Sequence, residues 1–208
     1  MGKRVFMFPG QGSQYIGMGK EFYDTMPNAK AVIDLASEQT GLDIPALCFE
    51  ENDKLNITEY TQICMLAVEA AIYQAIIDKG ITPDVTAGLS LGEYGALIAS
   101  GAMTMADAFA VVRKRGIYMQ EAVPTGGAMT AILGLDRVEI HDIKVPYITN
   151  VTADYVKSPA DVKDYLTKQV SSSVRWQQTI ERLIADGADE FVEIGPARSL
   201  SGFMRKIN

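Results

Sequence analysis

A repeated order of short apolar run, glycine-containing turn and helix-like segment constrains the fold of this chain more than any other feature. The runs at residues 5–8, 85–88 and 191–194 each lead through such a turn into a segment with helical character. Strands that alternate with helices pair in parallel, and helices then cover both faces of the sheet. The sequence therefore predicts an α/β protein, a three-layer αβα sandwich with a mainly parallel sheet.

The remaining elements follow from hydrophobic periodicity and from helix start and stop signals. Helices are predicted over residues 27–40, 58–79, 91–100, 105–121, 174–185 and 199–206, with another that begins at Ser158 and Pro159, and strands over 128–135 and 145–150. The helix at 58–79 has so wide an apolar surface that it must be nearly enclosed. Its apolar run at 63–77 is too short and too polar for a membrane span.

Composition limits the number of domains and the kinds of partner. The 208 residues are 48% hydrophobic and 22% charged, which predicts one domain over residues 1–208. A net charge of -7 and a pI near 4.8 argue against a nucleic-acid binder, since phosphate contacts need a dominant basic face. Cys48 and Cys64 lack metal-ligand spacing. With no secretory signal at the N-terminus, they predict free thiols in the cytoplasm, and we expect no metal and no membrane role.

The sequence Gly88-Leu89-Ser90-Leu91-Gly92 has the form of a nucleophile elbow. The predicted strand and helix flank it on the correct sides. On such a turn the Ser90 hydroxyl protrudes, and the N–H of Leu91 points at the position where an oxyanion forms. A helix N-cap is the alternative role for this serine, and the spacing allows both.

A glycine-rich loop at residues 10–14, GQGSQ, follows the first predicted strand and lies at the same carboxyl edge of the sheet as the elbow. An oxyanion hole needs a second N–H from another loop, and Gln11 is the predicted donor. A dinucleotide-binding loop is the rival interpretation. It is disfavoured because Tyr15 stands where that motif needs its third glycine, and no acidic residue ends a second strand about twenty residues further on.

Arg115 lies in the charged run Arg113-Lys114-Arg115 on the predicted helix at 105–121. A run of charges on a helix usually faces water. At the mouth of an acyl site, however, an arginine binds a carboxylate with two parallel hydrogen bonds, which a lysine does less well. Both interpretations of Arg115 stay open from the residues alone.

Five segments, which include the loop, the elbow and Arg115, are informative as a set. They are FPGQGSQYIGMG at 8–19, GLSLGEYGAL at 88–97, RGIYMQEAVP at 115–124, VPYITNVTA at 145–153 and EFVEIGPARSL at 190–200. Together, and in this order over nearly the whole chain, they resemble the malonyl-CoA:acyl carrier protein transacylases. The resemblance implies an acyltransferase of fatty acid or polyketide biosynthesis. Such an enzyme moves a malonyl group from coenzyme A to the phosphopantetheine thiol of acyl carrier protein through a malonyl-serine intermediate.

The resemblance also implies roles by matched position. Ser90 matches the nucleophile, and Gln11 and Leu91 match the residues whose backbone N–H groups form the oxyanion hole. Arg115 matches the residue that binds the malonate carboxylate. Gln169 matches the glutamine whose backbone carbonyl orients the catalytic histidine of the family. The implied partners are malonyl-CoA, as substrate, and acyl carrier protein; no metal and no cofactor are implied.

The chain departs from the family pattern in two places. Leu89 replaces the histidine of a GHSLG form, which is not the general base of the family. Relatives also carry a small ferredoxin-like lobe, which is missing here at a shortened junction near 134–145. Four strands and two helices of mean length need about 45 residues before loops, far more than the junction holds. The predicted strand at 128–135 then has no sheet to join, so residues 128–133 invite self-association.

His141 is the only histidine of the chain, and the segment that holds the catalytic histidine of the family is absent. His141 precedes the predicted strand at 145–150, so it lies at the amino end of that strand, whereas Ser90 lies at the carboxyl edge. At about 3.3 Å per residue the two are roughly 20 Å apart, and a general base needs hydrogen-bond reach. We therefore predict a nucleophile without its base and an impaired turnover. His141 as the base is the alternative.

Two other functions stay open from the sequence. A binding module holds acyl carrier protein or coenzyme A through Arg115 and the loop at 10–14 without turnover. A serine hydrolase releases the acyl group to water, which loss of the lobe favours if solvent reaches an acyl-serine. Binding that survives Ser90→Ala marks the first, and free malonate without acyl-carrier product marks the second.

Overall fold

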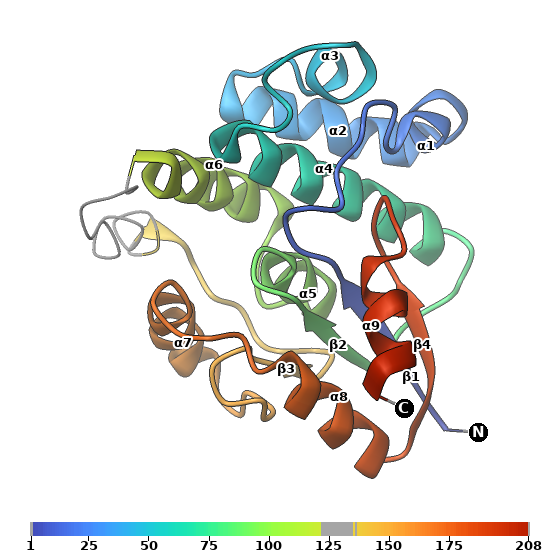
Figure 1. Cartoon of the computed structure of the whole chain (residues 1–208), viewed down its shortest axis with the longest axis vertical. Helices are drawn as coiled ribbons and strands as arrows, with labels where there is room; N and C mark the ends of the chain where they lie inside the picture. The colour runs from blue at the N-terminus through green and yellow to red at the C-terminus, as the bar shows by residue number, and fades with distance from the viewer. Residues whose placement is uncertain (1, 122–134, 136, 208) are drawn as a thin grey trace.

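The computed structural model describes residues 2–121, 135 and 137–207. At its centre is a four-stranded sheet in the order β3-β2-β1-β4 (Figure 1). The strands are β1 (Lys3–Phe8), β2 (Val85–Gly88), β3 (Tyr147–Ile148) and β4 (Ala188–Glu193). Each neighbouring pair of these strands is parallel, so the predicted parallel sheet is confirmed.

Helices cover both faces of the sheet. They are α1 (Lys20–Thr25), α2 (Pro27–Thr40), α3 (Ile44–Phe49), α4 (Thr58–Ile77), α5 (Gly92–Ser100), α6 (Met105–Glu121), α7 (Val162–Gln169), α8 (Trp176–Ala185) and α9 (Ser199–Ile207), with a 3-10 turn η2 (Pro159–Asp161) before α7. Phe6 and Phe8 pack into a core with α2, α4, α5 and α6, whereas Val5 and Met7 pack against α8 and α9 on the other face. Figure 1 shows how these helices lie around the sheet. Alternating side chains of β1 thus produce the predicted αβα layers.

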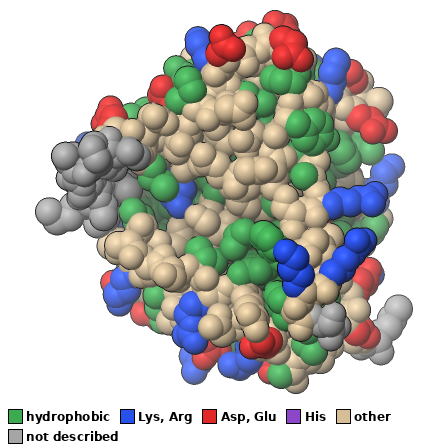
Figure 2. Space-filling view, in the orientation of Figure 1, with side chains coloured by type: hydrophobic (Ala, Val, Ile, Leu, Met, Phe, Trp, Pro, Cys, Tyr) green, Lys and Arg blue, Asp and Glu red, His purple; other side chains and the backbone are tan. Residues whose placement is uncertain are grey.

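The face of the molecule seen in Figure 2 has an uneven distribution of side chains. Charged side chains of both signs lie around its edge, and hydrophobic side chains gather near its centre with Lys and Arg beside them (Figure 2). The chain as a whole carries a net charge of -7. The basic side chains near this centre are therefore a local feature of an acidic protein.

Local signals set most element boundaries. α2 begins at Pro27, which suits a first helical turn, and ends before Gly41, whose φ of 69° is left-handed. α6 and β2 also have their predicted bounds. The sequence does not predict α1 and α3, because helices of 6 residues show no period. The Asp43 side chain, which accepts the Ala46 N–H at 2.9 Å, is the cap that marks the start of α3.

β3 is shorter than the strand predicted over 145–150. The Lys144 N–H donates to the carbonyl of Ser100 at the end of α5 (2.8 Å), and the Asn150 N–H donates to the side chain of Glu93 (3.1 Å). Helix-end and side-chain acceptors thus replace ladder partners on both sides of the strand. Because each N–H still finds an acceptor, the strand can end early without leaving buried donors unpaired.

The chain passes from α6 to β3 through the shortened junction. The described residues there, 135 and 137–146, contain no α-helix and no strand. Leu135 and Val138 are buried in the larger core. The strand predicted over 128–135 lies outside the described residues except for its last residue, and the surface predicted at 128–133 lies wholly outside them.

α4 has the length and mean hydropathy of a helix that crosses a membrane. However, 72% of its most apolar window is buried inside the molecule. It packs against α2, α5 and α6 as the central helix of the larger core. The nearly enclosed helix that the sequence predicts is therefore confirmed.

Candidate active site

Ser90 stands on the tight turn between β2 and α5. Its φ is 53°, a left-handed value that is uncommon for a residue with a side chain and is typical of functional turns. Gly88 and Gly92 allow this turn, because a Cβ at Gly92 would collide with the Phe8 carbonyl and a Cβ at Gly88 with Gly92 itself. The strand, turn and helix that a nucleophile elbow requires are thus all present.

The loop at 10–14 lies directly beside the elbow. A Cβ at Gly10 would come within 2.8 Å of the Leu89 carbonyl oxygen, so the two turns are in contact. Within the described part of the chain, neither the Gln11 N–H nor the Leu91 N–H has a hydrogen-bond acceptor. A cavity of about 240 Å³ opens between this loop, Leu89 and α9, and neither Ser90 nor Leu91 lines it. Two N–H donors without acceptors, on two turns in contact, are what an oxyanion hole requires.

Arg115 is buried, with only 3% of its surface exposed, whereas its neighbour Lys114 faces solvent. Its guanidinium donates to Gln62 Oε1 at 2.7 Å. It also lies 3.4 Å from both Ser90 Oγ and Gln169 Oε1. All three hydrogen-bond partners are uncharged, so the guanidinium can still pair with an anionic ligand beside the serine. The surface interpretation of this arginine is wrong.

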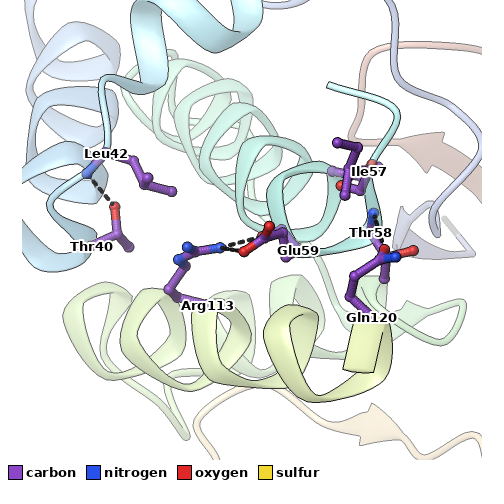
Figure 3. A network of polar contacts seen from close by, with 8 residues as sticks. Thr40, Leu42, Ile57, Thr58, Glu59, Arg113 and Gln120 are labelled. Carbon is purple, nitrogen blue, oxygen red and sulfur yellow. Dashed lines mark hydrogen bonds and ion pairs between the residues drawn. The ribbon is translucent and has the colours of Figure 1, made fainter. Parts of the chain in front are cut away.

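Side-chain contacts join α6, the helix that carries Arg115, to α4 (Figure 3). Arg113 donates to the backbone oxygen of Glu59 at 2.8 Å and to its carboxylate at 3.2 Å. Near the end of α6, Gln120 Oε1 accepts the Thr58 N–H at 3.1 Å. These bonds fix α6 against the first turn of α4, and so they set the position of the buried arginine.

Gln169 joins the site through its side chain. Nε2 donates to the Ser90 carbonyl at 3.0 Å and to Glu93 Oε2 at 2.6 Å, while Oε1 faces Arg115. Its backbone carbonyl, the group that the family resemblance singles out, accepts the Ser172 N–H at 3.4 Å. The side chain of Gln169 thus connects the turn that carries Ser90 to Arg115. No sequence motif indicates this connection.

Glu93 is fully buried one helical turn after Ser90. Burial raises the pKa of its carboxyl, and the hydrogen bonds from Gln169 and the Asn150 N–H and the positive charge of Arg115 oppose that rise. Oε2 accepts both of these hydrogen bonds. Glu93 therefore ties two segments from the carboxyl-terminal half of the chain to the elbow.

His141 lies at the opposite end of α5 from Ser90. Its N–H donates to the Ala102 carbonyl at 2.9 Å, and its side chain is 39% exposed beside Glu139. Because α5 spans 9 residues, about 14 Å of helix separates its two ends. The structure therefore places His141 out of hydrogen-bond reach of Ser90, as predicted. Among the described residues, no group of three His, Cys, Asp or Glu side chains is arranged to hold a metal ion.

Three buried polar residues of the site, Gln62, Glu93 and Asn150, go beyond the set that the sequence predicts. Gln62 and Glu93 interrupt apolar stretches of α4 and α5, and a polar residue buried in such a helix needs a partner. Asn150 ends the strand predicted over 145–150, at the sheet edge where ligand-binding residues gather. These signals are visible in the sequence, but the partners of each residue follow only from the tertiary structure.

Comparison with known proteins assigns the chain to a family. Residues 5–142, well over half of the chain, match the family model described as acyl transferase domain. The chain belongs to the acyl transferase family. A malonyl CoA-acyl carrier protein transacylase from Bacillus subtilis is 36% identical over 289 residues, covering 100% of this chain and 91% of that protein. One from Staphylococcus aureus is 29% identical and covers 100% of this chain and 93% of its own.

Solved structures of such transferases have the same fold. MCAT from Streptococcus pneumoniae superposes with a TM-score of 0.95 at 33% identity, over 99% of this chain and 93% of that chain. The malonyl CoA-acyl carrier protein transacylase from Clostridium perfringens gives a TM-score of 0.94 at 30% identity, over 99% of this chain and 90% of that chain. The predicted family, fold class and enzyme class, an acyltransferase, are confirmed.

This acyl transferase chain is shorter than its relatives. The alignment with the Bacillus subtilis protein runs over 289 positions and this chain has 208 residues, so at least 81 positions of the relative have no counterpart here. A lobe of four strands and two helices, about 45 residues before loops, fits within that difference.

Proposed function

We propose that this chain is an acyl carrier protein S-malonyltransferase with Ser90 as its nucleophile. One observation carries the proposal. Ser90 Oγ stands on a left-handed turn, 3.4 Å from the Arg115 guanidinium, and the N–H groups of Leu91 and Gln11 have no acceptor among the described residues. The names of the relatives supply the donor, malonyl-CoA, and the acceptor, acyl carrier protein. One solved neighbour is a type II PKS acyl-carrier protein in complex with its malonyl-transacylase.

The reaction has two half-reactions at one serine. In the first, Ser90 Oγ attacks the thioester carbonyl of malonyl-CoA, the C–S bond breaks, and the hydroxyl proton ends on the coenzyme A thiol. In the second, the phosphopantetheine thiol of acyl carrier protein attacks the carbonyl of the malonyl-serine ester, the C–O bond to Ser90 breaks as the new C–S bond forms, and the thiol proton returns to Ser90 Oγ. In both, the N–H groups of Gln11 and Leu91 stabilise the tetrahedral oxyanion.

Arg115 binds the free carboxylate of the malonyl group. A guanidinium donates two parallel hydrogen bonds to a carboxylate, and burial strengthens such a pair. Its contacts with Ser90 and Gln169 are long, at 3.4 Å, so a carboxylate displaces them without breaking a strong bond. The 2.7 Å bond to Gln62 keeps the guanidinium oriented meanwhile. The site therefore favours acyl groups that carry a second carboxylate.

Turnover is slow in this proposal because the nucleophile has no base. Among the described residues, Arg115 is the only side chain that hydrogen-bonds Ser90 Oγ, and a guanidinium does not accept a proton. We assign the missing lobe and histidine segment of the family to the shortened junction near 134–145. Without a base, a serine enzyme retains about 10³ to 10⁴ of rate enhancement over water.

Two further expectations belong to the proposal. Self-association through residues 128–133 stays a prediction. A cytoplasmic location is supported by Cys48 and Cys64, which are buried free thiols.

Intact-protein mass spectrometry after mixing with malonyl-CoA tests the nucleophile. We expect a malonyl adduct on the parent chain, no adduct on Ser90→Ala and an undiminished adduct on His141→Ala. Loss of the adduct in both variants, with the fold intact, makes His141 the base. The absence of an adduct from all three chains leaves a binding protein and removes the proposed transfer.

A further inference from the structure

Asn150 lies where the parallel ladder between β2 and β3 stops. The register pairs Ala87 with Ile148, and two residues further on it sets Leu89 opposite Asn150. In a parallel ladder, a residue in that place donates its N–H to the carbonyl one residue before its partner and accepts the N–H one residue after it. The backbone of Asn150 makes neither bond, because its N–H donates to Glu93 Oε2 at 3.1 Å.

The Asn150 side chain makes those two bonds instead. Nδ2 donates to the Gly88 carbonyl at 2.5 Å, and Oδ1 accepts the Ser90 N–H at 2.6 Å. A carboxamide offers the same N–H donor and carbonyl acceptor as a peptide group. The side chain therefore extends the pattern of hydrogen bonds between the two strands by one pair. The Asn150 carbonyl instead accepts the Arg175 N–H at 3.1 Å.

Because the Asn150 side chain replaces the backbone hydrogen bonds at this point, Ser90 does not need an extended backbone conformation to keep its N–H bonded. Ser90 turns to a φ of 53°, and its N–H stays hydrogen-bonded although the backbone partner has gone. Because that N–H is occupied, it is not available to an oxyanion. The Leu91 N–H is the next donor of the turn, and it has no acceptor among the described residues.

We propose that Asn150 is a positioning residue whose side chain replaces a pair of backbone hydrogen bonds between β2 and β3. It holds Ser90 in its left-handed conformation and occupies the Ser90 N–H, so that the N–H groups of Leu91 and Gln11 bind the oxyanion. The hold on Ser90 is a property of the free protein. Its effect on the reaction rests on the proposed malonyl transfer.

Amide hydrogen exchange at Ser90, followed by NMR, tests the hold. In Asn150→Ala the Ser90 N–H loses its acceptor, and we expect its exchange to become about tenfold to a hundredfold faster. Asn52→Ala is the matched control, because Asn52 Oδ1 also accepts two backbone N–H groups at 2.9 Å, in the loop between α3 and α4. It should leave Ser90 unchanged. An unchanged Ser90 exchange rate in folded Asn150→Ala contradicts the proposal.

If Asn150→Ala does not fold, hydrogen exchange at Ser90 in a second variant and in the parent chain still tests the proposal. Asn150→Asp keeps an acceptor for the Ser90 N–H but cannot donate to the Gly88 carbonyl when ionised, so Ser90 should stay protected. Loss of that protection in the folded variant contradicts the proposal. Fast exchange of Ser90 in the parent chain contradicts it without any variant.

The rate of malonyl-serine formation separates positioning from binding. In Asn150→Ala we expect this rate to fall by at least about tenfold at saturating malonyl-CoA, as when an oxyanion donor is misplaced. The calorimetric affinity for malonyl-CoA should stay the same, because Arg115 binds the carboxylate. Loss of affinity along with rate counts against positioning. If the parent chain forms no adduct, the proposed transfer fails, and exchange at Ser90 still decides the role of Asn150.

Discussion

Glu69 is a buried acid that the proposed reaction does not use. It lies on α4 between Gly95 and Gly195, and neither of its carboxyl oxygens has a hydrogen-bond partner among the described residues. Removal from water, with the negative charge of Glu193 in addition, raises the pKa of Glu69 well above its ordinary value. The carboxyl group is therefore protonated in the folded protein at pH values where an exposed glutamate is ionised.

Glu69→Gln should flatten the pH dependence of stability. Above the unfolded pKa of about 4.3, the unfolded chain releases this proton while the folded chain keeps it. The free energy of unfolding therefore falls by up to about 1.4 kcal/mol per pH unit until the folded pKa is passed. An amide has no proton to release, so urea denaturation between about pH 5 and pH 8 should show the variant gaining stability relative to the parent as the pH rises.

Glu38→Gln, on an exposed part of α2, controls for the substitution itself. If Glu69→Gln has the same pH dependence of unfolding as the parent, the buried carboxyl is already ionised in the folded protein. In that case an ordered water or a shift of the helix must supply the partner that its oxygens lack.

The contact between α4 and α6 depends on a glycine. A Cβ at Gly116 would lie 3.1 Å from the Glu59 Cα and 3.2 Å from the Thr58 carbonyl oxygen. That backbone cannot easily withdraw, because Arg113 and Gln120 hold it from the same helix (Figure 3). The spacing of these two helices also sets the position of the arginine in the candidate active site.

Gly116→Ala should destabilise the protein by about 1 to 3 kcal/mol in spite of the better helix propensity of alanine. Gly202→Ala is the matched control. Gly202 also lies inside a helix, α9, but its Cβ position is in open space, so the same change should stabilise by up to about 1 kcal/mol. Urea denaturation of both variants measures the two changes in unfolding free energy. Equal effects would mean that the contact between α4 and α6 tolerates a methyl group.

Elements with a long period and clear end signals are predictable from this sequence, whereas contacts between elements are not. α2 and α6 repeat their apolar positions over 14 and 17 residues, and both have the predicted bounds. β3 departs from its predicted bounds because its neighbours bond to acceptors on α5, far away in the sequence. Likewise, the motifs identify Ser90 and Arg115, but the burial of Arg115 follows from Gln62 on another helix.

The whole chain keeps the fold of longer relatives. It superposes on MCAT from Streptococcus pneumoniae with a TM-score of 0.95, although at least 81 positions of the Bacillus subtilis relative have no counterpart in its 208 residues. Segments on both sides of the junction near 134–145 supply the site, with Ser90 and Arg115 before it and Asn150 and Gln169 after it. The sheet and the elbow therefore form without the extra positions, and in our proposal the general base is the part that is lost with them.

The rate of malonyl transfer to acyl carrier protein should reveal whether the general base is lost. We expect a rate at least about 10³-fold below that of the Bacillus subtilis relative assayed in parallel, because removal of a general base from a serine enzyme abolishes most of its rate enhancement. The rate should also rise about tenfold per pH unit, since hydroxide must remove the Ser90 proton in place of a side chain.

Ser90→Ala gives the background reaction of malonyl-CoA with the acceptor thiol, and the difference from the parent is the enzymatic rate. A rate that levels off near pH 6.5, the ordinary pKa of histidine, means that an imidazole does act as the base. Because His141 lies at the far end of α5 from Ser90, that imidazole has to come from a second copy of the chain, and the rate then rises with protein concentration. Free malonate without acyl-carrier product instead means that water reaches the malonyl-serine before the acceptor thiol does.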